Sequence, residues 1–338
     1  VKLGKPTEER HILVEKGDAT YQFGIDYLRD VWYSTSYLLD RKQSMNGCAK
    51  KRFENYKKQP LEFVFDKSFT GKLSQFGLNP DRRTPTGIKA AIIREKGTNG
   101  EREMAYMLYL AGFDVKDVTM TDLVSGRETL EDINFIVFCG GFSNSDVLGS
   151  AKGWAGAFLF NPKAKAALDN FYARKDTLSL GVCNGCQLMI ELNLINPDFT
   201  QKAKMLHNDS HKFESKFVGV TVPMNRSVMF GSLSGSKLGI WVAHGEGKFS
   251  LPYHEDKYNV VLKYSYDEYP GNPNGSDYSV AGLASPDGRH LAMMPHLERS
   301  CFPWQNAYYP ADRIKNDQIT PWMEAFVNAR KWIEMNKK

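Results

Sequence analysis

An apolar stretch that turns through a cysteine constrains the fold of this 338-residue chain more than any other segment. Residues 177–190 read T-L-S-L-G-V-C-N-G-C-Q-L-M-I, which predicts a buried strand, a tight turn at Cys183 and an apolar helix. Glycine at 181 and 185 leaves room for such a turn. A thiol in the turn lies at a helix N-terminus, whose positive end favours thiolate. The segment therefore predicts the cysteine counterpart of a hydrolase nucleophile elbow.

Short apolar runs alternate with amphipathic stretches from residue 87 onward. A strand is indicated at 89–94 (K-A-A-I-I-R), and Met104, Met107, Leu108 and Ala111 recur at helical spacing before Gly112. The other expected elements are strands at 114–120, 134–139 and 177–182 and a helix over 163–175. This alternation predicts an α/β fold, a mostly parallel open sheet flanked by helices with its site at the carboxyl ends of the strands.

The last third of the chain shows strands with few helices between them. These strands are expected at 217–223, 238–243, 259–264 and 290–294, and they predict an antiparallel extension of the sheet. A final helix is expected with Thr320 as its N-cap and Pro321 in its first position.

Residues 1–86 differ from the rest of the chain in their pattern of apolar and charged residues. An apolar helical stretch around Trp32 runs into a basic segment at 41–58, which together are too little for a core. The basic run indicates a solvated helix face or linker, and a docking surface for an acidic partner or domain is the alternative. A turn-rich boundary at 79–87 divides a helical or linker segment, 1–86, from a domain over 87–338. Because the first residue is Val, we expect a piece of a longer or processed chain.

Composition excludes several classes of protein. The chain has 42% apolar residues, and 44 basic against 39 acidic residues give a net charge of +5, too mild to predict a nucleic-acid or membrane-surface partner. It contains no run of about 18 apolar residues that would span a membrane. Five cysteines at irregular spacing argue against a disulfide framework. We therefore predict a cytoplasmic protein with neither nucleic acid nor membrane as a partner.

Other roles for the cysteine must be weighed. Cys183 and Cys186 also spell C-x-x-C, the pattern of a redox pair or of half a zinc site. No second pair stands at zinc-finger spacing, and His207 and His211 lie in a polar loop without a third obvious ligand. We predict no metal site, and a nucleophilic Cys183.

A cysteine nucleophile needs a base and a group that orients the base. Two histidines stand in H-x-E motifs, His244 with Glu246 and His296 with Glu298. In an extended segment, residues two apart point to one side, so either carboxylate could hold its imidazole. Both motifs follow an apolar strand, and spacing alone does not choose between them.

Backbone donors for an oxyanion are expected at two places. The G-G-F-S segment at 140–143 follows a strand and offers unhindered N–H groups, as does Asn184 just after the cysteine. Losing one such donor typically costs about 10²-fold or more in rate.

Taken together, these motifs resemble class I (triad) glutamine amidotransferase domains. More closely, they are similar to the C-terminal glutaminase domains of the family of large, single-chain formylglycinamide ribonucleotide amidotransferases, or phosphoribosylformylglycinamidine synthases, of purine biosynthesis. The matching segments are 92–104, 111–115, 121–123, 139–149, 181–189, 240–247, 272–276 and 294–299. The resemblance covers about 87–338, and the N-terminal W-Y-S-T-S-Y resembles the end of the synthase body that precedes such domains.

The resemblance implies a flavodoxin-like fold and chooses between the histidines. The family motif M-P-H-P-E-R supplies the base and its carboxylate, which implies a triad of Cys183, His296 and Glu298 and leaves His244 a conformational or interdomain role. This chain departs from the motif at Leu297, where the family has proline, so local rigidity is in question.

The resemblance also implies the remaining site residues. Gly141 and Asn184 would form the oxyanion hole. By motif position, the residues expected to contact substrate are Gln187, Asn208 and Ser210. A second departure, Asn144-Ser145 where Tyr-Gly is common, could alter the loop near the substrate.

The implied reaction is hydrolysis of glutamine to glutamate, with ammonia passed to an ATP-dependent synthase that converts formylglycinamide ribonucleotide to the amidine. ATP and Mg²⁺ would belong to synthase domains of the same polypeptide, and no cofactor is expected within these residues. One alternative is a different cysteine hydrolase on the same fold, which the H-x-E placement and N-P-N-G-S (272–276) disfavour. The other is a catalytically silent docking module, which the intact triad disfavours.

Overall fold

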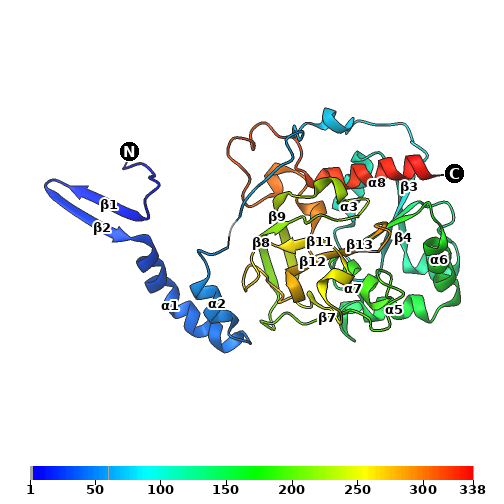
Figure 1. Ribbon diagram of the computed structural model, residues 1–338, viewed down its shortest axis with the longest axis horizontal. Helices are drawn as coiled ribbons and strands as arrows, with labels where there is room; N and C mark the ends of the chain where they lie inside the picture. The colour runs from blue at the N-terminus through cyan, green and yellow to red at the C-terminus, as the bar shows by residue number, and fades with distance from the viewer. Residues whose placement is uncertain (1–2, 60, 338) are drawn as a thin grey trace.

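A mixed nine-stranded sheet forms the centre of the protein in the computed structural model, which describes residues 3–59 and 61–337 (Figure 1). Five neighbouring strands run parallel, in the order β4 (Asp114–Thr119), β3 (Lys89–Arg94), β5 (Phe135–Phe138), β6 (Leu178–Val182) and β13 (His290–Met293). The antiparallel strands that continue the sheet are β12 (Val280–Ala284), β11 (Asn259–Tyr264), β8 (Glu214–Thr221) and β9 (Lys237–His244). The predicted α/β class is confirmed, as is its antiparallel extension.

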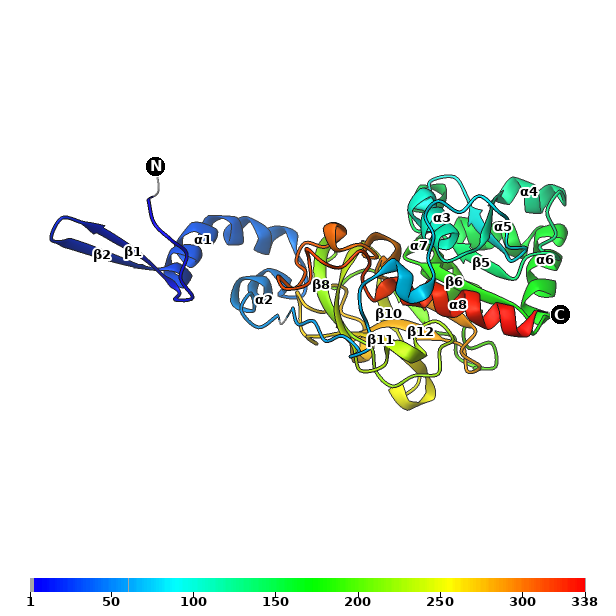
Figure 2. The same ribbon diagram turned by 90° about the horizontal axis from the view of Figure 1, so that it is seen from above.

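Helices pack against the parallel half of the sheet, and the last of them also reaches the antiparallel half, where Trp322 Nε1 donates to the Gly239 carbonyl of β9 at 2.9 Å. They are α3 (Glu101–Leu110), α4 (Met120–Ser125), α5 (Lys152–Leu159), α6 (Pro162–Ala173), α7 (Asn184–Glu191) and α8 (Trp322–Asn336). α7 contacts β5, β6 and β13, α3 contacts β3 and α8, and both α4 and α5 contact α6 (Figure 2). Local signals set some of these starts, since Asn161 caps α6 through the Ala164 N–H and a Thr119–Asp122 capping box opens α4.

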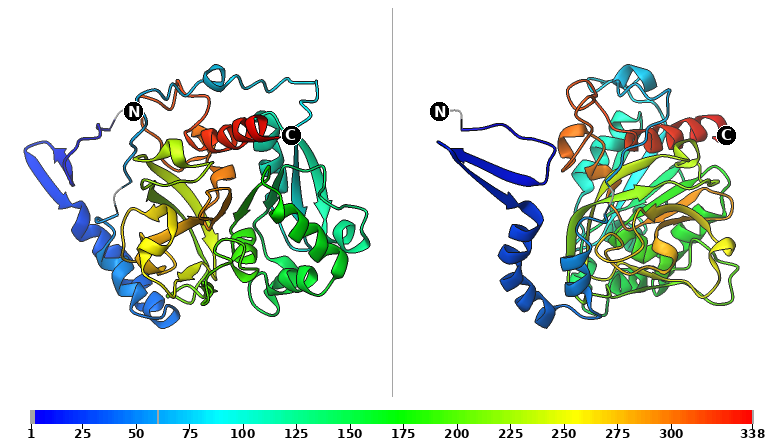
Figure 3. Two further views of the ribbon diagram at one scale, coloured as in Figure 1. Left: turned by 45° about the vertical axis from the view of Figure 1, so that its right-hand side comes forward. Right: turned by 60° about the vertical axis from the view of Figure 1, so that its left-hand side comes forward.

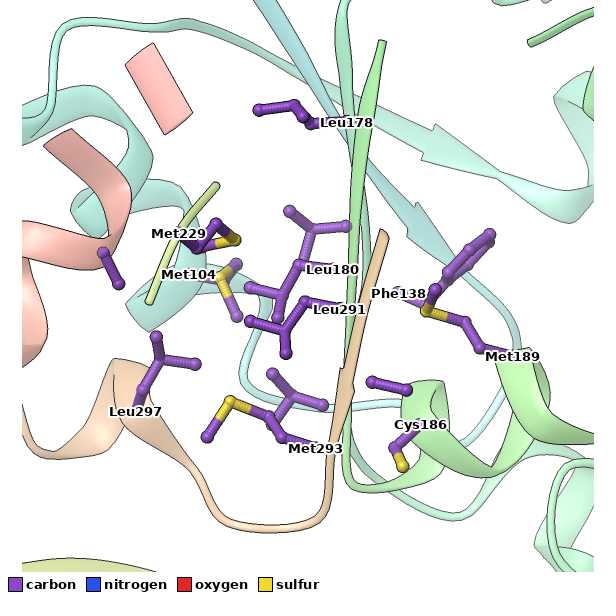
Figure 4. Close-up of a cluster of buried hydrophobic side chains, with 14 of the residues drawn as sticks. Met104, Phe138, Leu178, Leu180, Cys186, Met189, Met229, Leu291, Met293 and Leu297 are labelled. Atoms are coloured by element: carbon purple, nitrogen blue, oxygen red, sulfur yellow. The ribbon is translucent and has the colours of Figure 1, made fainter. Parts of the chain in front are cut away.

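The core lies on both faces of β6 and β13. Figure 4 shows Leu180, Leu291 and Met293 on one side of these strands and Met189 and Phe138 on the other. Strands covered on both faces read as continuous apolar runs, which is why β5 (F-I-V-F) and β6 (L-S-L-G-V) were readable from sequence. This packing fixes the end of β6, and with it the position of the turn that follows.

Several elements were not predicted, and several boundaries differ; the strand expected at 217–223, for example, runs over Glu214–Thr221. β12, α4 and α5 are absent from the predicted set, as is the small pair of β7 (Lys204–Leu206) with β10 (Lys248–Ser250). Thr320 does not cap α8, because its hydroxyl donates to the carbonyl of Ser300 at 2.7 Å. Pro321 is the N-cap instead, and the helix begins one residue later.

The N-terminal segment projects from the body (Figure 1). It contains the hairpin of β1 (His11–Lys16) and β2 (Ala19–Gly24), then α1 (Ile25–Gln43) and α2 (Cys48–Glu54). Every residue of the hairpin is exposed, and α1 exposes large apolar side chains such as Trp32 and Tyr27. The hairpin was missed although the sequence carries a signal for it, since A-T-Y-Q-F (19–23) alternates apolar and polar residues after a Gly17-Asp18 turn.

Residues 61–86 run along the body to β3 (Figure 3). Val64 forms a β-bridge with Lys237 of β9, and Phe69 is 5% exposed within the core. Packing onto the body therefore begins before residue 87, and the division into 1–86 and 87–338 stays a prediction.

The cysteines and the helices bear on two expectations drawn from the composition. All five cysteines are free thiols with buried side chains. In residues 3–59 and 61–337, we find no helix with both the length and the apolar character needed to cross a membrane.

Gly185 should tolerate no side chain. A Cβ there would lie 2.0 Å from the carbonyl oxygen of Phe138, so Gly185→Ala should lower the free energy of unfolding by about 1–3 kcal/mol in urea denaturation. Gly156→Ala in α5 is the matched control, because its nearest neighbour would be 3.8 Å away and helix propensity should raise stability by about 0.5–1 kcal/mol. Equal stabilities of the two variants would contradict the close packing of α7 on β5.

Candidate active site

Cys183 stands on a strained turn between β6 and α7. Its φ of 53° and ψ of −107° are rarely adopted by non-glycine residues, and such strain persists only where the surroundings impose it. The Cys183 N–H donates to the carbonyl of Met293 at 2.9 Å, and Gly185 packs directly on Phe138. The thiol is 5% exposed and donates to the carbonyl of Ala243 at 3.4 Å. The elbow predicted from the sequence is present.

His296 lies beside the thiol at the end of β13. Gly140 touches both groups, since a Cβ on it would lie 2.8 Å from His296 Cε1 and 3.3 Å from Cys183 Cβ. His296 Nδ1 is 2.7 Å from Glu298 Oε1, and both side chains are 2% exposed. Nε2 is buried and has no hydrogen-bond partner within the described residues. The structure thus brings the three predicted triad residues together.

Charge determines the protonation of His296. Burial acts to lower its pKa, but the charge of Glu298, the hydrogen bond to Glu298 and the adjacent Cys183 outweigh burial and raise the pKa to about 10. The imidazole therefore holds its proton at neutral pH, where it can pair with a thiolate and later donate the proton to a leaving group.

The second H-x-E motif is built differently. His244 Nδ1 contacts Asn208 Oδ1 at 3.2 Å, whereas Glu246 accepts a hydrogen bond from the Ser150 N–H at 3.2 Å. Burial, together with the positive charge of His296, lowers the pKa of His244 to about 3. His244 is thus a neutral imidazole without a carboxylate partner, and the two motifs that spacing could not separate differ in geometry.

The two predicted oxyanion donors are available. The N–H groups of Gly141 and Asn184 donate to no carbonyl or side chain within the described residues. At Asn184 this follows from its place in the first turn of α7, where helix N–H groups have no partner within the helix. Gly141 has φ 120°, and a Cβ on it would lie 2.6 Å from the carbonyl oxygen of Gly97, so only glycine fits. The Asn184 side chain fixes this loop by accepting from the Ser143 N–H at 3.0 Å.

The three predicted substrate contacts all have protein partners. Gln187 Nε2 donates to the Glu246 carbonyl at 2.7 Å, and Asn208 Nδ2 donates to the His244 carbonyl at 2.7 Å. Ser210 Oγ instead donates to Glu214 Oε1 at 2.6 Å. Direct contact with substrate stays a prediction for each, and the structure gives Gln187 and Asn208 a role in holding residues 244–247.

The structure shows the surroundings of both positions at which the chain departs from the family motifs. Leu297 is fully buried and lies near Met104 in the core (Figure 4), so packing holds this turn where a proline ring would. Asn144 and Ser145 adopt left-handed conformations with φ of 51° and 56° in the loop after Gly141.

Two contacts of the site were missed by sequence reasoning. The Ala243 carbonyl faces the thiol, and Gly140 lies against both the nucleophile and the base. The G-G pair was the available signal for Gly140. The Ala243 carbonyl belongs to the backbone, so no pattern of side chains in the sequence could predict its contact with the thiol.

Comparisons with known proteins agree with this geometry. Residues 87–333 match the family described as the CobB/CobQ-like glutamine amidotransferase domain. The chain is 40% identical over 334 residues to a probable phosphoribosylformylglycinamidine synthase, chloroplastic/mitochondrial, of Arabidopsis thaliana, covering 91% of this chain and 23% of that protein. It is 40% identical over 336 residues to phosphoribosylformylglycinamidine synthase of Homo sapiens, covering 90% of this chain and 24% of that protein.

A solved structure is also similar. The structure of PurLQS from Thermotoga maritima matches with a TM-score of 0.55 and 27% identity, covering 74% of this chain and 99% of that chain. The chain spans about a quarter of the length of the curated relatives it matches. From the family match over residues 87–333, with a strained cysteine elbow at its centre, we conclude that the chain belongs to the CobB/CobQ-like glutamine amidotransferase domain family.

Proposed function

We propose that this domain hydrolyses glutamine with Cys183 as nucleophile, His296 as acid and base, and Glu298 as the residue that orients His296. The observation that carries the proposal is the buried arrangement in which Glu298 holds His296 at 2.7 Å while Gly140 lies against both His296 and Cys183. Family membership supports it independently.

The reaction follows from the positions of these groups. The Cys183 thiolate attacks the side-chain carboxamide carbon of glutamine, and the N–H groups of Gly141 and Asn184 stabilise the oxyanion. As the carbon–nitrogen bond breaks, His296 protonates the nitrogen and ammonia leaves a thioester. His296 then takes a proton from water, whose oxygen attacks the thioester carbon and releases glutamate and the Cys183 thiol.

The ammonia is proposed to serve a synthase reaction. Relatives of which this chain spans about a quarter are named phosphoribosylformylglycinamidine synthase, so we propose that the domain serves purine biosynthesis. A cytoplasmic location is part of this proposal and does not come from the relatives, since the Arabidopsis thaliana protein is named chloroplastic/mitochondrial. Synthase domains of a longer polypeptide would use ATP and Mg²⁺ to convert formylglycinamide ribonucleotide to formylglycinamidine ribonucleotide. Glutamine is the substrate proposed for the residues described.

Labelling should identify Cys183 as the nucleophile. We expect a diazo-ketone analogue of glutamine to add once, at Cys183, and glutamine to slow the reaction, as measured by intact mass and peptide mapping. Cys183→Ala should abolish labelling and hydrolysis while leaving thermal stability nearly unchanged. Cys186→Ala is the matched control, because this thiol lies three residues later, is fully buried and should be dispensable. An inert wild-type thiol, also in the presence of the synthase half, would favour a silent docking module.

Substitution should separate the two histidines. His296→Gln should reduce kcat/KM by at least about 10²-fold, because it removes the group that moves protons. His244→Gln should have a smaller effect, since His244 is neutral and has no carboxylate partner. Steady-state glutaminase kinetics on both variants test this, and the reverse order would place the base in the 244–246 motif.

The pKa of His296 should depend on Glu298. In Glu298→Gln the burial of the imidazole persists while the opposing charge of the carboxylate is lost, so the pKa of His296 should fall well below its wild-type value of about 10. Because the pKa of His296 is higher in the folded state, the protonated imidazole contributes its full stabilisation of the fold below pH 6.5. This contribution is lost as the pH rises through about 10. The wild type, and not the variant, should therefore lose stability over that interval.

Histidine ring NMR measures this titration directly. The matched internal control is His290, whose pKa is lowered to about 4 by burial and by neighbouring Arg289 and should not respond to Glu298→Gln. An unchanged His296 titration in the variant would show that Glu298 does not set the charge of the base.

A further inference from the structure

The N-terminal helices meet the body at a cluster of two buried carboxylates and three partly buried basic groups, hereafter the charge cluster: Asp40, Arg52, Lys212, Glu214 and Lys216. Arg52 of α2 contacts Asp40 of α1 at 2.6 Å and Glu214 of β8 at 3.5 Å. Lys212 contacts Asp40 at 3.0 Å, and Lys216 contacts Glu214 at 2.7 Å. The side chains of Asp40 and Glu214 are only 8% and 3% exposed. Burial acts to raise the pKa of Asp40, but hydrogen bonds to Ser44 and Lys212 and the charge of Arg52 hold it below its ordinary value.

The 207–212 loop is held both by the charge cluster and by the residues between α1 and α2. Ser210 Oγ donates to Glu214 Oε1 at 2.6 Å, which ties the loop to the cluster. The N-terminal segment adds backbone contacts, since the Met45 N–H donates to the Ser210 carbonyl at 3.0 Å and Asn46 Nδ2 donates to the Asp209 carbonyl at 2.8 Å. The residues between α1 and α2 thus bind this loop directly.

The same loop holds the segment that lines the thiol. Asn208 donates from its backbone to the Gly245 carbonyl at 2.9 Å, and its Oδ1 accepts from the Gly247 N–H at 3.0 Å. Next to these contacts, the Ala243 carbonyl accepts from Cys183, and the Glu246 carbonyl accepts from Gln187 of α7. Hydrogen bonds therefore run without a break from α2, through the 207–212 loop and residues 243–247, to the nucleophile elbow.

We propose that Arg52 is a positioning residue for the glutamine site: it holds Glu214 and the 207–212 loop, and through Asn208 it sets the position of residues 244–247 beside Cys183. This inference rests on the proposed function, because glutamine is taken as the ligand of that site. It gives the N-terminal helices, which carry no catalytic group, a role in substrate binding.

Arg52→Met in the 338-residue chain tests the proposal. The variant keeps an apolar stem but loses both ion contacts, so we expect glutamine affinity to fall by about 5- to 150-fold, the usual size of coupling between sites. Affinity is read as the glutamine concentration that halves the rate of Cys183 alkylation by iodoacetamide. In steady-state kinetics KM should rise while kcat changes less, and Arg52→Lys should restore part of the loss.

Arg313→Met is the matched control. Arg313 pairs with Asp317 at 2.8 Å, and these side chains are 24% and 4% exposed, against 25% and 8% for Arg52 and Asp40. Both guanidinium groups also stack on aromatic rings, that of Arg313 at 4.6 Å from Phe65 and that of Arg52 at 5.1 Å from Tyr269. Because Arg313 contacts Phe69 rather than the 207–212 loop, its loss should leave glutamine affinity unchanged.

Hydrogen exchange gives a readout that needs no glutamine. The amides of residues 208–211 and 245–247 should exchange faster in Arg52→Met than in the wild type and in Arg313→Met. If Arg52→Met does not fold, Asp40→Leu/Arg52→Met removes both members of the ion pair and avoids an unpaired buried charge. Unchanged affinity and exchange in the Arg52 variants, or equal changes in the Arg313 variant, would overturn the proposal. If glutamine fails to slow alkylation of the wild type, the proposed function fails, and exchange alone decides the positioning role.

Discussion

The close approach of α7 to β5 is the constraint on which the site depends. Gly185 lies so near the carbonyl of Phe138 that the chain has no room to leave β6 by a relaxed turn, and Cys183 takes up the strain. Strain of this kind costs about 1–3 kcal/mol, which the apolar packing of β6 and α7 must offset. The result is a thiol fixed at the N-terminus of a helix, with free N–H groups on either side of it.

The sheet supplies the site from both of its halves. Parallel strands β6 and β13 carry the nucleophile and the base, so their pairing register determines how Cys183 faces His296. The antiparallel half contributes β9, whose end provides the Ala243 carbonyl and neutral His244. β13 pairs with β6 on one side and β12 on the other, and this junction explains how one site collects groups from distant parts of the chain.

The sequence revealed the elbow and the parallel strands because both depend on local patterns, a glycine-flanked turn and continuous apolar runs. The sequence pattern alone could not decide whether His244 or His296 is the base, because this depends on which carboxylate lies next to each imidazole in the fold. The resemblance to the family favoured His296. Arg52 stands in a basic run that the sequence indicated as a solvated face or linker. It packs inward because Glu214, 162 residues away, lies opposite it, and no local pattern pairs charges so distant.

The buried Leu297 makes the core itself part of the catalytic apparatus. A proline there would hold the turn through its own covalent ring, independently of its neighbours. With leucine, the turn that carries Glu298 is held by packing, to which α3 contributes. The orientation of the carboxylate then depends on the apolar interior, so side-chain volume lost at a neighbouring core position such as Met104 would reach the reacting groups through the packing around Leu297.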